Sequence, residues 1–297
     1  MKRTFIYICI AVAMAATLLV GCGGSNRSKQ VDGKEQIFVS IAPLRPLVSA
    51  IVGDDFEISI LVPTGASPES FEPTARQFIA LNDAKAIFAV GLIDFERNLL
   101  SKIEDKGKII DLSYGISLIA GSCSHNHSNH NGCSHTHHSH GIDPHIWTSP
   151  VALKIMAQNA YNSIAAAHPD STKYKSNFEQ LNARLDSLDS SVRTLCDGAR
   201  TRQFIIYHPA LTYLARDYDL EQISIEQDGK EPSVRRLAGV IDNARANGIK
   251  RIFYQSTYPR STVEVVAEDI EAEPIEIDPL REDIFTNIEE ITRLITE

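Results

Sequence analysis

The sequence is poor in cysteine and lacks the common signatures of hydrolytic and phosphate-binding sites. Its 297 residues include 5 cysteines, which are too few for a disulfide framework once Cys9 and Cys22 are set aside. The patterns His-Glu-x-x-His and Gly-x-Ser-x-Gly and the phosphate-binding loop pattern are absent from it. A net charge of -9 disfavours nucleic acid as a partner and suits the attraction of cations. The absences favour a binding protein over an enzyme.

The N-terminus carries a short apolar run that predicts export. Lys2 and Arg3 precede apolar residues 6–20, which are too few for a membrane span and indicate a signal peptide over residues 1–21. The ending Leu-Val-Gly-Cys resembles the lipobox of bacterial lipoproteins, which implies cleavage before Cys22 and a lipid on its sulfur. A plain signal peptide is the alternative, but polar residues continue as a tether over 22–35. We therefore expect an exported, lipid-anchored protein, periplasmic or extracytoplasmic.

The rest of the chain is long enough for two domains, and its strands and helices are expected to alternate. A hydrophobic content of 43% supports a sizeable core. Expected strands are 36–42, 56–62, 86–90, 108–112, 203–207, 221–225, 250–254 and 274–277. One expected helix ends near residue 53 and another begins at residue 74. The other expected helices span 95–103, 149–167, 171–196, 210–218, 233–247, 261–270 and 283 to the end.

This alternation predicts an α/β protein with mostly parallel sheets covered on both faces. The expected helix 171–196 is long, has no strand beside it, and is interpreted as a spacer between the domains. The predicted division is an N-terminal α/β lobe over 36–148, a helical linker region over 149–200 and a C-terminal α/β lobe over 201–297.

A histidine-rich segment over residues 121–141 interrupts the N-terminal lobe. It holds seven of the 10 histidines, and imidazole is a common zinc ligand. Because the segment lacks apolar residues, we expect a mobile loop that binds metal weakly rather than a tight site. Cys123 and Cys133 can pair as a disulfide or act as metal ligands, and the sequence does not decide between these. The seven histidines are His125, His127, His130, His135, His137, His138 and His140.

Four other side chains stand where α/β sheets bind ligands, beyond the carboxyl ends of strands. Glu69 lies on the loop after the second expected strand, His208 directly follows strand 203–207, and Asp278 directly follows strand 274–277. His145 stands between a proline and an apolar pair before a helix, so its position can be fixed; a buried histidine bonded to the backbone is the alternative. Because two of these side chains belong to each lobe, we expect a metal site in the cleft between the lobes.

Several motifs taken together resemble a known family. The chain is similar to the cluster A-I substrate-binding lipoproteins of metal importers of the ATP-binding cassette (ABC) class, the zinc- and manganese-binding proteins of the ZnuA type. The resemblance covers nearly the whole mature chain and implies two Rossmann-like lobes, a long backbone helix and one metal in the interlobe cleft. Besides the histidine-rich loop, the matching segments are 67–74 (SPESFEPT), 143–147 (DPHIW), 207–214 (YHPALTYL), 231–233 (EPS) and 277–280 (IDPL).

The resemblance carries a ligand set over to this chain. His145, His208 and Asp278 match family ligands of the same type, whereas Glu69 stands where the family usually has histidine. A glutamate oxygen can bind zinc, although a larger share of oxygen moves the preference toward manganese or iron. Histidine-rich loops accompany zinc proteins in this family, so we expect Zn²⁺, with Mn²⁺ or another divalent transition metal as the alternative. For Glu69 the alternative is a solvated carboxylate, with water or Glu72 completing the site.

The expected function is capture of a cation and its delivery, without catalysis. The resemblance implies the solute-binding component of a metal ABC importer, which passes the ion to a membrane permease, and we expect a monomer. The affinity should fall as the pH drops through about 6.5, because the imidazoles must lose protons to bind metal. Two alternatives are a periplasmic zinc buffer or metallochaperone built on the histidine-rich loop, and a zinc-dependent hydrolase with one coordination position open for water.

Overall fold

The structure, a computed structural model, describes residues 33–121, 141–226 and 230–297. The predicted signal peptide, Cys22, the seven histidines of the histidine-rich loop, Cys123 and Cys133 all lie outside these residues. Just outside that loop, Ala120 and Ile142 pair as an antiparallel bridge. No helix of the described part is long and apolar enough to cross a membrane.

The N-terminal lobe is built on a parallel sheet with the strand order β2-β1-β3-β4. Its strands are β1 (Glu35–Val39), β2 (Phe56–Ile60), β3 (Ala86–Ala89) and β4 (Ile109–Asp111). Its helices are η1 (Ala42–Leu44), α2 (Arg45–Val52), α3 (Ala75–Asp83), α4 (Asp94–Leu100) and η2 (Lys106–Lys108). Thr74 caps α3 as predicted, because its hydroxyl accepts the Gln77 N–H while the Gln77 side chain accepts the Thr74 N–H. The cap fixes the end of the loop that carries Glu69.

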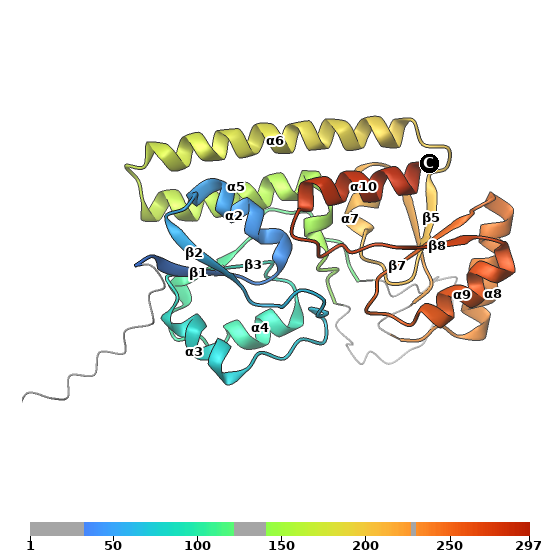
Figure 1. Ribbon diagram of the computed structural model, residues 1–297, viewed down its shortest axis with the longest axis horizontal. Helices are drawn as coiled ribbons and strands as arrows, with labels where there is room; N and C mark the ends of the chain where they lie inside the picture. Colours follow the sequence, from blue (N-terminus) through green and yellow to red (C-terminus); the bar gives the residue numbers. More distant parts are fainter. Residues whose placement is uncertain (1–32, 122–140, 227–229) are drawn as a thin grey trace, which may run out of the picture. The chain divides into compact units, whose positions relative to one another are not determined.

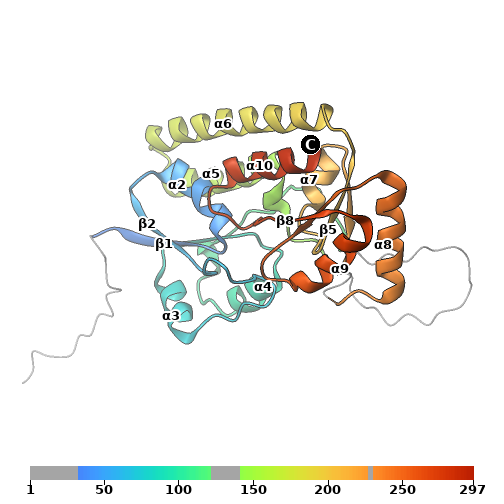
Figure 2. The ribbon, with the colours of Figure 1, turned by 45° about the vertical axis from the view of Figure 1, so that its right-hand side comes forward.

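The C-terminal lobe repeats this plan with the strand order β6-β5-β7-β8 (Figures 1 and 2). Phe204 and Ile206 of β5 face one apolar core, and Ile205 faces a second core built with α8 and α9. Burial on both faces is usual for a parallel strand. The strands are β5 (Gln203–Ile206), β6 (Glu221–Ser224), β7 (Arg251–Tyr254) and β8 (Glu273–Glu276). The helices are α7 (Thr212–Asp217), α8 (Val234–Asn247), α9 (Arg260–Ile270) and α10 (Ile284–Thr296).

A layer of helices joins the two lobes. After η3 (Ile146–Thr148) come α5 (Pro150–Ala167) and α6 (Thr172–Asp197), and α6 packs on α2 and α5 and also on α10 of the C-terminal lobe (Figure 1). Residues of both sheets and of this layer belong to one apolar core. The long helix thus lies between the domains as expected, and its apolar stripe is also buried. Separating the lobes would open a close-packed core.

The predicted α/β fold, with two parallel sheets and a long helix, is confirmed. All eight expected strands are present, and most end one to three residues earlier than expected. Residues that follow β1, β2, β5, β7 and β8 line the cleft. The single-turn helices η1, η2 and η3 were not expected. The division of the chain at residues 148 and 200 stays a prediction.

Candidate metal centre

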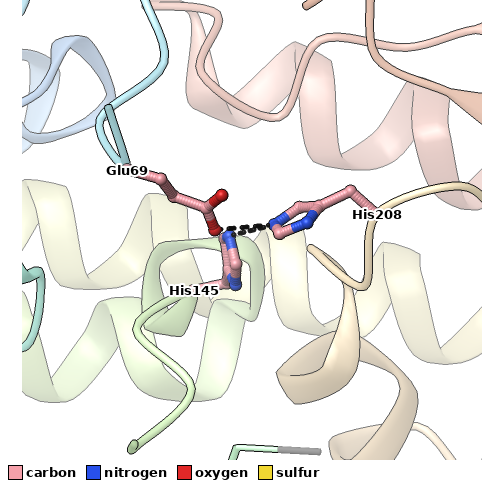
Figure 3. A group of neighbouring side chains, drawn as sticks. All are labelled: Glu69, His145 and His208. Carbon is pink, nitrogen blue, oxygen red and sulfur yellow. Dashed lines mark hydrogen bonds and ion pairs between the residues drawn. The ribbon is translucent and has the colours of Figure 1, made fainter. Parts of the chain in front are cut away.

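Three donor side chains meet in a cleft lined by both lobes. Glu69, His145 and His208 each offer one ligand atom, and these atoms lie within 4.8 Å of one another. Figure 3 shows the carboxylate and the two imidazoles pointing toward a common centre. Tyr258 and Asp278 line the same cleft from the C-terminal lobe. The structure therefore brings three of the four predicted ligands together.

The spacing of these donors suits a small cation. The two Nε2 atoms of His145 and His208 are 3.3 Å apart. Tetrahedral zinc with bonds of about 2.0–2.1 Å requires its ligand atoms to lie about 3.3 Å apart. Glu69 Oε1 lies 2.9 Å from His208 Nε2 because the two groups form a direct ion pair. An entering ion would replace that pair with two bonds to metal.

His145 is held by a carboxylate two residues before it. Its Nδ1 lies 2.9 Å from Asp143 Oδ1, and the same oxygen accepts the His145 backbone N–H at 2.9 Å. The Thr148 hydroxyl donates to the His145 carbonyl. Burial alone would raise the pKa of Asp143, but the hydrogen bond and charge of His145 outweigh it, so that this pKa lies below its ordinary value. With Nδ1 engaged in this way, Nε2 is the nitrogen that faces the centre.

His208 is held by a carboxylate that lies just past the neighbouring strand β6. The last pair of residues in the β5–β6 ladder is Ile206 with Ser224. His208 and Glu226 each lie two residues beyond this pair, so they stand side by side. The His208 Nδ1 and Glu226 Oε2 atoms are 2.9 Å apart, and Glu226 is only 3% exposed. Sequence reasoning missed Glu226, although its place just past strand 221–225 was a usable signal.

These neighbours change the protonation of His208. Burial alone would lower the pKa of His208, but the hydrogen bonds and charges of Glu226 and Glu69 raise it to about 9. At neutral pH the imidazole therefore donates from both nitrogens, and a metal ion has to displace the Nε2 proton. The pH range near 6.5 expected from the sequence is too low for this histidine.

Glu69 is the most exposed of the three donors, with 41% of its side chain accessible. Its second oxygen, Oε2, accepts a hydrogen bond from the Tyr258 hydroxyl at 3.0 Å. Burial alone would raise the pKa of Glu69, but the hydrogen bond and charge of His208 lower it below the ordinary value. The carboxylate is thus ionised and oriented by residues of the opposite lobe.

The fourth predicted ligand and the alternative to Glu69 lie elsewhere. Asp278 lines the cleft, but it is exposed, its Oδ1 accepts the Leu280 N–H at 2.8 Å, and it is not part of the group of three. Glu72 is exposed and does not line the cleft. The structure brings Glu69 together with the histidines, and Asp278 lines the same cleft outside this group.

Two parallel-sheet lobes with imidazoles and a carboxylate converging between them define a two-lobed metal-binding protein. The family model of the periplasmic zinc-uptake complex component A, ZnuA, matches residues 37–296, and the chain belongs to this family. The predicted resemblance is thereby confirmed. The family is one of solute-binding proteins, not of enzymes.

Named relatives agree with this assignment. The zinc-binding protein AdcA of Streptococcus pyogenes is 28% identical over 82% of this chain and 50% of its own length. The high-affinity zinc uptake system protein ZnuA of Bacillus subtilis is 28% identical over 87% of this chain and 83% of its own. A crystal structure of ZnuA superposes with a TM-score of 0.78 at 31% identity, covering 89% of this chain and 98% of the other. The chain thus spans about half the length of the streptococcal relatives it matches.

Proposed function

We propose that this chain is the extracytoplasmic solute-binding component of a zinc ABC importer, which captures Zn²⁺ in the interlobe cleft and passes it to a membrane permease. The observation that carries the proposal is the convergence of Glu69, His145 and His208 from separate parts of the chain on one centre. Relatives named for zinc binding and zinc uptake support it. We further propose attachment to the membrane through a lipid on Cys22, and action as a monomer.

Zinc is favoured over manganese by the nitrogen donors and by the carboxylates that are hydrogen-bonded to them. Each imidazole is backed by a buried carboxylate, Asp143 or Glu226, an arrangement that makes a histidine a stronger ligand. Zinc accepts this mixture of nitrogen and oxygen in a four-coordinate site. Asp278 is the proposed fourth donor, because it lines the same cleft, where its Oδ1 accepts the Leu280 N–H. Mn²⁺ remains the alternative cargo.

Calorimetric titration of the metal-free protein with zinc tests this function. We expect one tight ion plus several weak ones, loss of the tight ion in His145→Ala, and retention of it in a variant lacking residues 124–140. His168→Ala is the matched control, because this imidazole lies away from the cleft, against Phe56 and Tyr174. Tight binding that survives His145→Ala would overturn the proposal, and weak ions alone would favour a zinc buffer.

A coordination count by X-ray absorption on the zinc-loaded protein separates the importer from the hydrolase. An importer that encloses its cargo presents four protein donors, whereas a hydrolytic site keeps one position for water. Two imidazoles and two carboxylates around the ion are expected. An ordered water in place of a carboxylate would favour the hydrolase.

A further inference from the structure

We propose that Tyr258 is a specificity-determining positioning residue, which restricts Glu69 to a one-oxygen ligand and thereby favours zinc over larger cations such as Mn²⁺. The inference rests on the proposed function, because it concerns the selectivity of the same site. It arises from the two oxygens of Glu69, which have different partners.

The two oxygens of the Glu69 carboxylate are divided between the centre and the tyrosine. Oε1 lies 2.9 Å from His208 Nε2, where the ion is expected. Oε2 lies 3.0 Å from the Tyr258 hydroxyl, which donates to it. A hydrogen bond to a charged carboxylate is stronger than one between neutral groups. The hydroxyl therefore holds Oε2 away from the ion.

Tyr258 is itself fixed by contacts that do not involve its hydroxyl. Its ring stacks on the His208 imidazole, with centroids 4.9 Å apart and planes at 13°. It also contacts the Tyr207 ring in a tilted arrangement, with centroids 5.3 Å apart. Its backbone N–H donates to the Gln255 carbonyl in the turn after β7. The ring position is set by the same lobe that holds His208, so replacement by phenylalanine removes only the hydroxyl.

Selectivity follows from the number of donors that the site can offer. Zinc is satisfied by four ligands, whereas manganese prefers six, mostly oxygen. The second oxygen of Glu69 belongs to a carboxylate that already contributes Oε1, and a carboxylate that binds through both oxygens would raise the number of protein ligand atoms by one. Because its hydroxyl donates a hydrogen bond to Oε2, Tyr258 keeps the number of protein ligand atoms low. The hydrogen bond between Tyr258 and Glu69 also crosses the cleft, since the two residues belong to opposite lobes.

Competition titrations of zinc against manganese on Tyr258→Phe test the inference. We expect zinc affinity to fall roughly 10-fold, as is usual when a partner of a ligand is removed, while manganese affinity is kept or rises. The zinc-to-manganese preference should fall by at least the same factor. In a crystal structure of the manganese-loaded variant, both oxygens of Glu69 should bind the ion, with the second replacing a water, whereas in wild type only Oε1 should bind it; a merely structural role would not produce this difference.

Tyr218→Phe is the matched control. Its hydroxyl donates to Asp189 Oδ1 at 2.7 Å, another tyrosine–carboxylate bond, but Tyr218 does not line the cleft. The metal preference of this variant should equal that of wild type. In a Glu69→Ala background, Tyr258→Phe should have no further effect on the preference, because the tyrosine acts through Glu69.

Failure of the inference and failure of the function give different results. If wild type binds zinc tightly and Tyr258→Phe leaves both the zinc-to-manganese preference and the one-oxygen binding of Glu69 unchanged, Tyr258 does not set selectivity and the zinc-binding function stands. A persistent effect in the Glu69→Ala background also overturns the inference. If wild type binds no tight zinc, the function itself fails, and the inference fails with it.

Discussion

The two lobes share one strand order, yet each holds its histidine in a different way. His145 of the N-terminal part is backed by Asp143, two residues away in the same turn. His208 of the C-terminal lobe is backed by Glu226, 18 residues later and two residues past the adjacent strand β6. The first arrangement is local and the second depends on the sheet. The C-terminal half of the site is therefore a product of tertiary structure, and the N-terminal half largely of a short motif.

Exposure separates Glu69 from the two histidine–carboxylate pairs, since His145 and Asp143 expose only 11% and 10% of their side chains. His208 and Glu226 expose 9% and 4% of their side chains, whereas Glu69 exposes 41% and depends on Tyr258 for orientation. A buried, doubly bonded imidazole is a fixed ligand, whereas an exposed carboxylate on a loop can move. The comparison indicates that His208 is the more rigidly held ligand and that Glu69 is the more easily moved one.

Replacement of His208 is expected to have the largest effect on zinc binding and is the strongest test of this comparison. We expect His208→Ala to lower zinc affinity by at least about 100-fold, more than the loss of a supporting partner costs. The variant should also unfold more easily by about 3–5 kcal/mol, because Glu226 is left buried without its partner. Zinc titration and urea unfolding measure both effects. Glu69→Ala, the exposed counterpart, should lose less affinity and little stability; an equal loss would contradict the contrast between the halves.

A second contrast lies at the third strand of each sheet. After β3, Val90 and Gly91 donate their N–H groups to the buried Glu96 carboxylate at 3.0 and 2.7 Å. After β7, the neutral amide of Gln255 donates to the His208 carbonyl instead. Burial raises the pKa of Glu96 from 4.5 to about 7 despite its hydrogen bonds. Only the N-terminal lobe thus carries a buried acid that titrates near neutrality at this place.

The stability of the metal-free protein should depend on pH through Glu96. The folded state holds the Glu96 proton more tightly than the unfolded state, so this contribution is complete below pH 4.5 and is lost as the pH rises through about 7. The free energy of unfolding of wild type relative to Glu96→Gln should fall by about 3 kcal/mol over that interval. Urea unfolding at several pH values measures it. Exposed Glu57→Gln is the control, and a difference independent of pH would show that Glu96 stays ionised.

The carboxylates behind the histidines allow a finer test. Glu226→Gln and Asp143→Asn keep the shape and remove the charge, and each should weaken zinc binding about 10- to 100-fold, or about 1.4–2.7 kcal/mol. Only Glu226→Gln should lower the pKa of His208 from about 9, as followed by NMR. Because this also weakens the competing proton, the loss of zinc affinity should be larger at pH 9 than at pH 7. An identical pH profile for both variants would show that the halves do not differ.

The predictability of the site follows the same division. Asp143-Pro144-His145 is one contiguous motif, so His145 could be recognised without knowing the fold. Glu226 required the β5–β6 register, and a four-residue strand such as β6 does not fix its register by pattern alone. Tyr258 could not be found at all, because its partner Glu69 is 189 residues away.

For the fold, hydrophobic periodicity located the strands and helices, but it did not identify their partners. The apolar stripe of α6 has the helical period, with Leu181, Leu185, Leu188 and Val192 buried. The same stripe suits a spacer helix or one packed on both lobes. Only the three-dimensional arrangement shows that α2, α5 and α10 cover it.

The smallest effect is expected at the ion pair between Arg45 and Glu282, a second contact between the lobes. Their charged groups lie 3.2 Å apart, and the side chains are 43% and 49% exposed. Exposed pairs of this kind contribute about 0–1 kcal/mol, so Arg45→Gln should change the free energy of unfolding by less than about 1 kcal/mol and leave zinc affinity within about twofold. A 10-fold loss of zinc affinity would mean that surface charges hold the cleft together. If the loss is absent while Tyr258→Phe shifts the metal preference, the lobes are positioned by their shared core, and the contact across the cleft serves the ion.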